Sequence, residues 1–431
     1  MRRRAAIVFV VGIVWTTAYA LWQRAHEDDA WGEEPAIARH IALGHGFASP
    51  AADGPEAPPT AWSPPAYPYL AAGIFAVLGI DTPAARLALV LVNTLAMSAA
   101  AAGLVVLAGR MFGPRVGVVA GAIFLAHPII LVHVLFLWDT CLALALFLWL
   151  LAWAQSLGAS PPSPGRAALM GAGLGVLCLI NSSYALALPL VALLALGTGP
   201  GATRLRALGC LGAAFIVVLL PWTIRNWLVF DRLMFVRGGI SVELWLGNVP
   251  GSDGLTYNVL RHHPLNAQGE RESWLSLREP GYYDLCQSRF LADYQADPLA
   301  FWRRSARRVI HLALGDPKQP QDCPLLPTLR MGRWAVGHIV LSVVVAAMAA
   351  WGIVRAWWRG RWGLWPLLAG LLAVSPFVFT HVHDRYALPL RAMMVLYAVV
   401  ALAKPTTVHP SVQDPPPSGR PSEEAARSAP E

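Results

Sequence analysis

The amino-acid sequence predicts an all-α protein that crosses a membrane about ten times, with interfacial helices and one large loop outside the cytoplasm. Only 13% of the 431 residues are charged and 56% are hydrophobic, whereas a soluble chain has about 25% charged residues. The hydrophobic residues form continuous runs close to the ~20 residues that a helix needs to cross hydrocarbon. Only helices and closed β-barrels pair all their backbone hydrogen-bonding groups in lipid. Because the hydrophobic runs do not alternate with polar residues, they favour helices over a β-barrel.

Ten hydrophobic runs are predicted to be spans, the two central ones being short. They are 5–22, 84–109, 116–132, 140–153, 167–179, 184–196, 207–222, 334–354, 364–379 and 387–403. The run 66–80 begins with Tyr and Pro after a polar loop, so we expect a helix at or in the membrane interface. The first run follows three arginines and resembles a signal peptide with Ala18-Tyr19-Ala20 as its cleavage site. Its length and the many later spans favour an uncleaved first helix.

The basic residues predict how the spans are oriented. With the N-terminal arginines in the cytoplasm, every short loop on that side carries a base, as the positive-inside rule requires. These bases are Arg110 and Arg115, Arg166, Arg204 and Arg206, Arg355, Arg359 and Arg361, and Lys404. Both termini are therefore predicted to be cytoplasmic, and any active site extracytoplasmic.

The predicted spans divide the chain into four parts. They are a membrane core (1–222) whose first outer loop (23–83) carries the candidate catalytic acids, an extracytoplasmic region (223–333), the C-terminal membrane helices (334–403) and a disordered cytoplasmic tail (404–431). No repeated half is visible, which counts against a transporter built from inverted repeats.

Two classes of partner are not expected. The bases lie between hydrophobic runs and form no nucleic-acid-binding motif, so no nucleic acid is expected. The five cysteines lack the spacing of metal ligands, so no metal centre is expected from them. Cys286 and Cys323 share one outer loop, where a disulfide between them is an open alternative to two free thiols.

Acidic residues are scarce, so those in the first outer loop are candidates for catalysis. Glu33 and Glu34 precede apolar residues at 37, 41 and 43, a pattern that predicts a short amphipathic helix on the membrane surface beginning near Glu34-Pro35. The alternative is a structural role, because the helix dipole stabilises acids at a helix N-terminus.

Asp139 is a second candidate, at the outer end of a predicted span and flanked by apolar residues. An acid at the edge of hydrocarbon is costly, which makes it a functional candidate. The alternative is an N-cap for a helix starting at Thr140. The two roles are compatible.

Arg225 and Arg385 lie at the outer ends of two other spans. A guanidinium offers a fork of N–H groups that matches phosphate oxygens, whereas the alternative is snorkelling to the lipid headgroups. His381 and His383 precede Arg385, but two histidines without a cluster of acids are a weak metal site, so no metal is expected here either.

Several stretches, taken in order, resemble the GT-C class of polyprenyl-phosphate-sugar-dependent glycosyltransferases, in the branch that contains aminoarabinose transferases and protein O-mannosyltransferases. They are Glu33-Glu34, Gly44-His45-Gly46-Phe47, residues 59–68, residues 221–226 and Asp384-Arg385-Tyr386. Each motif alone is loose, and their order and spacing carry the resemblance over nearly the whole membrane portion.

This resemblance implies a role for each candidate. Glu34 or Glu33 would be the catalytic carboxylate, and Asp139 a second catalytic acid. The implied substrate-binding residues are Arg225, Arg385, Tyr67 and His383. No cofactor is implied, because the lipid-linked sugar is itself the donor substrate.

The implied reaction moves a hexose or pentose from a polyprenyl-phosphate donor to a glycan, lipid or protein acceptor, with inversion at the anomeric carbon. A carboxylate would accept the proton of the acceptor, and arginines would stabilise the leaving phosphate. The alternatives are a lipid or polysaccharide transporter or flippase, a polysaccharide polymerase or ligase, and a non-catalytic scaffold. A transporter places ionisable groups near the bilayer midplane, whereas the acids here lie at the outer edge.

Overall fold

The computed structural model describes residues 1–27, 32–157, 162–197, 200–315, 335–358 and 361–403. In this part of the chain every regular element is helical, and β-structure is limited to two isolated bridges. The predicted tail 404–431 and Cys323 lie outside it, and Cys286 is a buried thiol.

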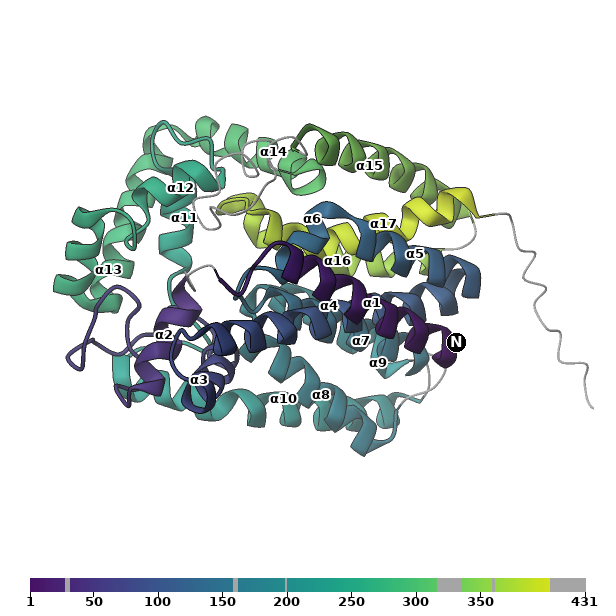
Figure 1. The fold of residues 1–431 in the computed structure, drawn as a ribbon, viewed down its shortest axis with the longest axis horizontal. Coiled ribbons are helices and arrows are strands. Elements are labelled where there is room, and N and C mark those ends of the chain that lie inside the picture. Colours follow the sequence, from purple (N-terminus) through teal and green to yellow (C-terminus); the bar gives the residue numbers. More distant parts are fainter. Residues whose placement is uncertain (28–31, 158–161, 198–199, 316–334, 359–360, 404–431) are drawn as a thin grey trace, which may run out of the picture.

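The helices run lengthwise through an elongated bundle, with a group of shorter helices at one end (Figure 1). Their bounds are α1 Arg2–Trp22, α2 Glu33–Ala42, α3 Ala66–Leu78, α4 Pro83–Phe112, α5 Pro114–Ala126, α6 Pro128–Leu131, η1 Val132–Val134, α7 Thr140–Leu157, α8 Pro164–Ile180, η2 Ser182–Ala187, α9 Leu188–Leu196, α10 Gly201–Phe230, α11 Ile240–Asn248, α12 Thr256–His262, α13 Gln268–Ala296, α14 Pro298–Leu314, α15 Ala335–Trp358, η3 Arg361–Leu364, α16 Trp365–Phe379, η4 Asp384–Ala387 and α17 Leu388–Leu402.

Each predicted span coincides with helix in the structure, but the number ten is not confirmed. Among the described residues, six helices are long and apolar enough to cross a membrane, and α5 with α6 and η1 forms a seventh candidate bent by 67°. The bend falls at Pro128, where proline cannot donate to the helical ladder. The remaining predicted spans, α8, η2 with α9, and α16, are shorter apolar helices, as is α3.

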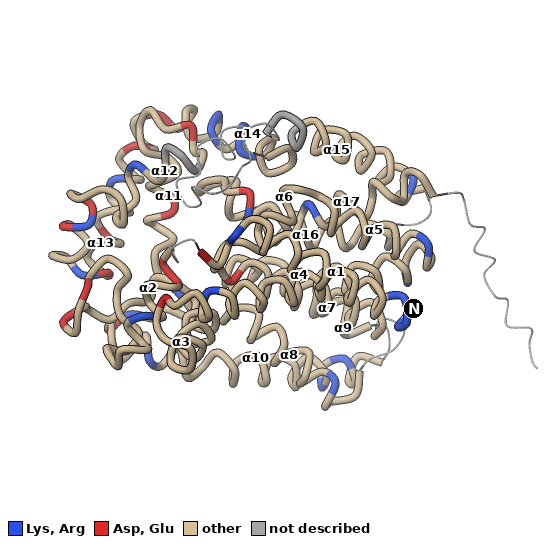
Figure 2. Tube along the Cα trace, in the orientation of Figure 1, with Lys and Arg blue, Asp and Glu red and all other residues tan. Residues whose placement is uncertain are grey.

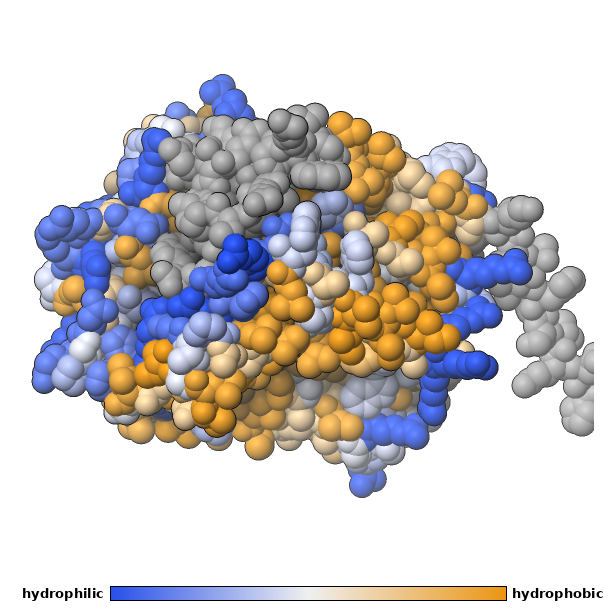
Figure 3. Space-filling model, viewed as in Figure 1, coloured by the Kyte–Doolittle hydropathy of each residue, from blue (hydrophilic) through white to orange (hydrophobic). Residues whose placement is uncertain are grey.

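The centre of the bundle is formed by α4, α7 and α17, whereas α1, α10 and α15 expose much of their apolar surface. Side chains of small volume allow the peripheral helices to approach closely. A Cβ at Gly171 of α8 would lie 2.0 Å from the carbonyl oxygen of Leu211 in α10. The exposed apolar side chains form a continuous flank of the molecule, as expected for a surface in contact with lipid (Figure 3).

Helices α11 to α13 follow α10 and gather with α2 at one end of the bundle, and α14 leads from them to α15 (Figure 1). Helices α11, α12 and α13 share with the first outer loop a second core that is separate from the membrane core and rich in aromatic residues. Its largest members are Trp62, Trp245, Trp274, Tyr282 and Tyr283. Because Trp62 belongs to the first outer loop, this core fixes that loop to the outer helices.

Charge is distributed unequally between the two ends of the bundle (Figure 2). Acidic and basic residues mix at the end with α2, α11 and α13, whereas the opposite end carries only bases among the described residues. The bases at that end include Arg110, Arg115, Arg166 and Arg204, all from predicted cytoplasmic loops. The asymmetry agrees with the positive-inside pattern, and the sidedness itself stays a prediction.

Candidate active site

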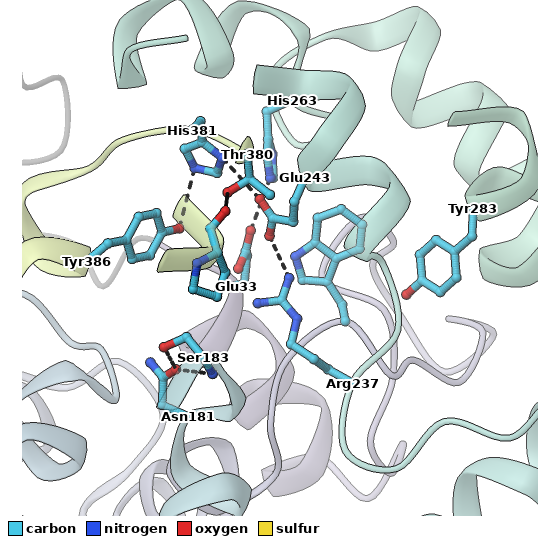
Figure 4. Close-up of polar contacts among 12 residues, drawn as sticks. Glu33, Asn181, Ser183, Arg237, Glu243, His263, Tyr283, Thr380, His381 and Tyr386 are labelled. Carbon is cyan, nitrogen blue, oxygen red and sulfur yellow. Dashed lines mark hydrogen bonds and ion pairs between the residues drawn. The ribbon is translucent and has the colours of Figure 1, made fainter. Parts of the chain in front are cut away.

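A cavity of about 300 Å³ opens at the acid-rich end of the bundle, where the outer helices meet the ends of the spans (Figure 4). Segments far apart in the sequence line it. They are Gly32–Glu34, Ser63 and Pro64, Trp138 and Asp139, Asn181–Ser183, Arg237–Glu243, Val259–Leu265 and Pro376–Tyr386, each contributing several of its residues. The predicted site residues Glu33, Glu34, Asp139, His383 and Arg385 all line this one cavity.

Helix α2 brings the two first-loop acids to the cavity. It begins at Glu33, so both acids lie in its first turn, where the helix dipole favours negative charge. Gly32 precedes it with φ 130°, a conformation that side chains rarely adopt, and a Cβ there would lie 3.0 Å from the indole nitrogen of Trp138. A glycine is therefore required for the chain to turn into α2 against Trp138.

The two adjacent glutamates have different surroundings. Glu33 lies 3.1 Å from Nε2 of His263. Burial opposes its ionisation, but His263 and the charge of Arg385 outweigh burial and hold the pKa of Glu33 below its usual value. Glu34 has no such partner among the described side chains, and burial together with the charge of Asp139 raises its pKa to about 8.

Asp139 immediately precedes α7 and is 5% exposed. Burial raises its pKa to about 6, against the opposing effects of Arg385 and of hydrogen bonds with Asn181 and Thr140. The carbonyl oxygen of Asn181 accepts from the Ser183 backbone at 3.0 Å and from its hydroxyl at 2.6 Å, which fixes the orientation of this amide. Burial thus raises the pKa of both acids, and Glu34 takes up its proton at a higher pH than Asp139 does.

Arg385 is held in the cavity wall by aromatic rings. Its guanidinium lies 4.2 Å from the ring centroid of Trp138, and Nη2 donates to the hydroxyl of Tyr386 at 3.1 Å. No carboxylate of the described residues lies within 4.0 Å of it, and its buried Nε has no hydrogen-bond partner. The neighbouring Asp384 pairs instead with Arg391, at 2.6 Å.

A chain of polar contacts crosses the cavity from Arg237 to Tyr386 (Figure 4), and Tyr386 continues it to Arg385. Nη2 of Arg237 donates to Glu243 at 2.6 Å, and the other carboxylate oxygen of Glu243 lies 3.2 Å from Nδ1 of His381. Nε2 of His381 is 3.4 Å from the hydroxyl of Tyr386, which accepts from Arg385. Because a carboxylate only accepts, the proton of a neutral His381 belongs on Nδ1, and Tyr386 donates to Nε2.

Ion pairing sets the charge of Glu243, the carboxyl group in this chain of polar contacts. Burial opposes ionisation of Glu243, but His381 and Arg237 hold its pKa well below its usual range. Glu243 is therefore an anion whose two oxygens tie the start of α11 to the segment after α16.

Two predicted substrate-binding residues do not line the cavity. Arg225 lies in α10, where Nη1 donates to the carbonyl oxygen of Thr60 at 2.7 Å and Nη2 to that of Phe47 at 3.2 Å. Tyr67 is fully buried in α3. A phosphate-binding role for Arg225 stays a prediction, while its contacts in the structure are with the first outer loop.

A buried carboxylate holds the other side of this loop. Glu279 of α13 is 3% exposed and accepts hydrogen bonds from the Thr60 hydroxyl, from the Ala61 backbone at 2.8 Å and from Tyr283 at 2.9 Å. Burial raises its pKa to about 7 against these hydrogen bonds. The segment that leads to Ser63 and Pro64 in the cavity is thus fixed from both sides.

Sequence reasoning missed several cavity residues, chiefly Arg237, Glu243, His263 and Asn181. They lie in the outer region or in a short loop, without a span boundary to draw attention to them. The scarcity of acids is the one signal that points to Glu243. No group of three or more His, Cys, Asp or Glu side chains in the described residues is arranged to hold a metal ion.

The apolar helical bundle, with acids and an arginine in a cavity at one end, has a GT-C-like fold. The chain is similar in fold to the archaeal oligosaccharyltransferase AglB from Archaeoglobus fulgidus, solved with an inhibitory peptide and a dolichol-phosphate (TM-score 0.53, 12% identity, covering 92% of this chain and 50% of that one). It therefore spans half the length of the archaeal protein.

A second similar structure is ArnT from Cupriavidus metallidurans bound to undecaprenyl phosphate, with TM-score 0.41 and 18% identity over 92% of this chain and 76% of that one. No protein-family model matches the sequence, and no curated protein matches it.

Proposed function

We propose that this protein is a membrane glycosyltransferase that moves a sugar from a polyprenyl-phosphate donor to an acceptor outside the cytoplasm. The observation that carries the proposal is the convergence of Glu34, Asp139 and Arg385 in one cavity at the end of an apolar bundle. Such a site pairs groups that accept a proton with a cation that stabilises phosphate. The lipid tail of a donor can stay among the apolar helices while its phosphate reaches the cavity.

Glu34 is the preferred general base. Its carboxyl lines the cavity without a side-chain partner among the described residues, whereas Glu33 is engaged by His263. As the acceptor attacks the anomeric carbon, its O–H or N–H proton passes to the carboxylate while the bond from that carbon to the phosphate oxygen breaks. Asp139 lies near enough to raise the pKa of Glu34, so it strengthens the base.

Arg385 is the preferred group for the donor phosphate. The phosphate gains negative charge as it leaves, and a fixed guanidinium in a water-poor site stabilises that charge. Arg385 has a free buried Nε, and stacking on Trp138 orients the fork of donors without neutralising it. The likeness to AglB supports the fold alone, and the dolichol-phosphate of that structure makes a polyprenyl-phosphate donor the natural first choice.

The test is transfer by the purified full-length protein in liposomes. Polyprenyl-phosphate hexoses and pentoses carrying a labelled sugar are supplied in turn, and release of polyprenyl phosphate is measured with and without an extract of envelope glycans and lipids. We expect turnover with at least one donor and its loss in the Glu34→Gln protein. Binding of such donors without any turnover would refute a transferase and leave a carrier or scaffold.

Sidedness is tested separately by cysteine labelling in intact cells. We expect a cysteine at Asp253 to react with an impermeant reagent, and one at Ser163 to react only after permeabilisation. The opposite pattern would place the cavity in the cytoplasm, where nucleotide sugars are available, and would remove the reason for a lipid-linked donor.

A further inference from the structure

Helix α14 has apolar residues on two faces. Its buried face carries Phe301, Ser305, Arg308 and Leu312, at a spacing of three and four residues. Its exposed face carries Leu299, Trp302, Val309 and Ile310, each more than half exposed, together with Ala306. These exposed positions also recur every three or four residues, so they form one stripe on the helix. A helix packed on a soluble core would place polar residues on that stripe.

The position of α14 indicates what covers the stripe. The helix packs on α15, α16 and α17 on one side and on α13 on the other, so it lies where the spans give way to the outer helices (Figure 1). Its neighbour α15 exposes Val340, Val343 and Val344 on its own flank. A second exposed apolar stripe at this level extends the lipid-facing surface into the interface, where tryptophans such as Trp302 are enriched.

The edge of the stripe is basic. Arg303 and Arg307 are exposed, lie four residues apart on one side of the stripe, and have no ion-pair partner among the described residues. Arg304 and Arg308 differ, because both reach Asn248, at 3.3 and 3.0 Å. The two exposed guanidinium groups are thus left for a ligand at the depth of the lipid phosphates.

We infer that α14 lies in the outer interface of the bilayer and binds the headgroups of anionic phospholipids through Arg303 and Arg307. The buried face connects this contact to the cavity. Arg308 is fully buried and donates to the carbonyl oxygens of Gly247, Val378 and Phe379, at the ends of α11 and α16. Both helices carry cavity residues, so a lipid that holds α14 also steadies the cavity wall.

The depth of the helix is measured on the full chain in liposomes. A nitroxide is attached to a cysteine at Ala306, with one at Gln287 on the exposed side of α13 as the matched control and the unsubstituted protein as background for native cysteines. We expect the nitroxide at residue 306 to collide mainly with oxygen, which dissolves in lipid, and the nitroxide at residue 287 to collide mainly with a water-soluble nickel reagent. Free access of the nickel reagent to residue 306 would overturn the inference. Low access of both reagents would also overturn it, because it would mean that protein covers the stripe.

Headgroup binding is measured by the phospholipid retained on the protein from nanodiscs that mix phosphatidylcholine with phosphatidylglycerol. Arg303→Gln and Arg307→Gln should each lower retention of phosphatidylglycerol about fivefold, the effect of one basic residue at an anionic surface. Arg278→Gln, the same change on exposed α13, should leave it unchanged. Equal retention by all the proteins would overturn the headgroup contact, even with residue 306 in lipid. Neither measurement depends on transferase activity.

Discussion

Two half-buried arginines at the outer ends of spans have opposite environments. Arg225 donates to backbone carbonyl oxygens of the first outer loop, so the protein itself uses its hydrogen-bonding groups. Arg385 is held by the ring of Trp138 and the hydroxyl of Tyr386, with Nε unpaired and no carboxylate within ion-pair distance among the described residues. The same residue type at the ends of two spans thus has its donors taken by the protein in one place and keeps an unpaired donor in the other.

The difference extends to the acids beside each arginine. Glu279, near Arg225, accepts three hydrogen bonds from the protein. Glu34, near Arg385, faces the cavity without a side-chain partner. Substitutions around Arg385 should therefore change catalysis with little effect on stability, and substitutions around Arg225 should do the reverse.

The largest effect is expected from Glu34→Gln. Removing the general base should slow transfer by about 10²–10⁴, while the unfolding temperature at pH 8 stays the same or rises because a costly buried charge is gone. Transfer rates at saturating donor, with circular dichroism on heating, measure the two effects. Glu33→Gln is the matched control and should slow transfer less than Glu34→Gln does. A greater loss in the control would make Glu33 the base.

The pH profile sharpens this assignment. A base acts when ionised, and burial raises the pKa of Glu34 to about 8. The rate in the wild-type protein should therefore rise with pH up to about 8 and level off above it. In Glu34→Gln the residual rate should lack this rise. A profile that already levels off near pH 5 would exclude Glu34.

Arg385→Lys is expected to have the next largest effect. A lysine keeps the charge but lacks the fork, so kcat/KM for the donor should fall about ten- to a hundredfold, the value of a hydrogen bond to a charged group. Asp384→Asn is the control, because Asp384 pairs with Arg391 and not with Arg385. Asp384→Asn should lower the unfolding temperature and leave kcat/KM for the donor nearly unchanged. Unchanged kinetics in Arg385→Lys would make Arg385 a snorkelling residue.

Glu279→Ala should act mainly on stability. It leaves buried donors of Thr60, Ala61 and Tyr283 unpaired, at a cost of about 1–3 kcal/mol for a buried unsatisfied group, and the unfolding temperature in detergent should fall by several degrees. Donor KM at low temperature should change little. A change in KM without a change in stability would contradict the anchoring role.

Glu279 also contributes a pH dependence of stability. Its pKa is raised to about 7 in the folded protein, so the folded state holds a proton that the unfolded chain has released. Its contribution is therefore complete at low pH and is lost as the pH rises towards 7. Glu279→Gln should reduce the fall in unfolding temperature between pH 5 and pH 8.

The smallest effect is expected at His381, which positions Tyr386 and Arg385. Glutamine can donate to Glu243 and accept from Tyr386, so His381→Gln should keep donor KM within a few-fold of the wild-type value. His381→Ala removes both contacts and should raise KM further than it lowers kcat. Equal values for the two variants would show that the polar chain does not position Arg385.

The sequence was sufficient for the helices and for part of the site. Continuous apolar runs predict spans, and each run is helical in the structure, while α8, α9 and α16 show that run length alone does not fix the number of crossings. Glu34 could be predicted because acids are scarce and it lies in the first outer loop, and Asp139 and Arg385 because charges at span ends are rare; the structure brings all three to one cavity.

Other residues could not be found in this way. Arg225 has the same local pattern as Arg385, and its contacts with Phe47 and Thr60, the latter 165 residues away in the chain, distinguish its surroundings from those of Arg385. Arg237 and Glu243 pair with each other locally, and they reach the cavity only because this segment folds against His381, after α16.

The contact between Arg225 and the first outer loop has a consequence for how the protein is made. The loop is synthesised early, and Arg225 follows Thr60 by 165 residues. At roughly 5–20 residues per second, roughly 8–33 s separate the synthesis of Thr60 from that of Arg225, and Glu279 follows later still. During that interval the tryptophan and proline residues of the loop are accessible to chaperones and proteases. Correct formation of the cavity therefore depends on steps that precede the synthesis of its last lining segment.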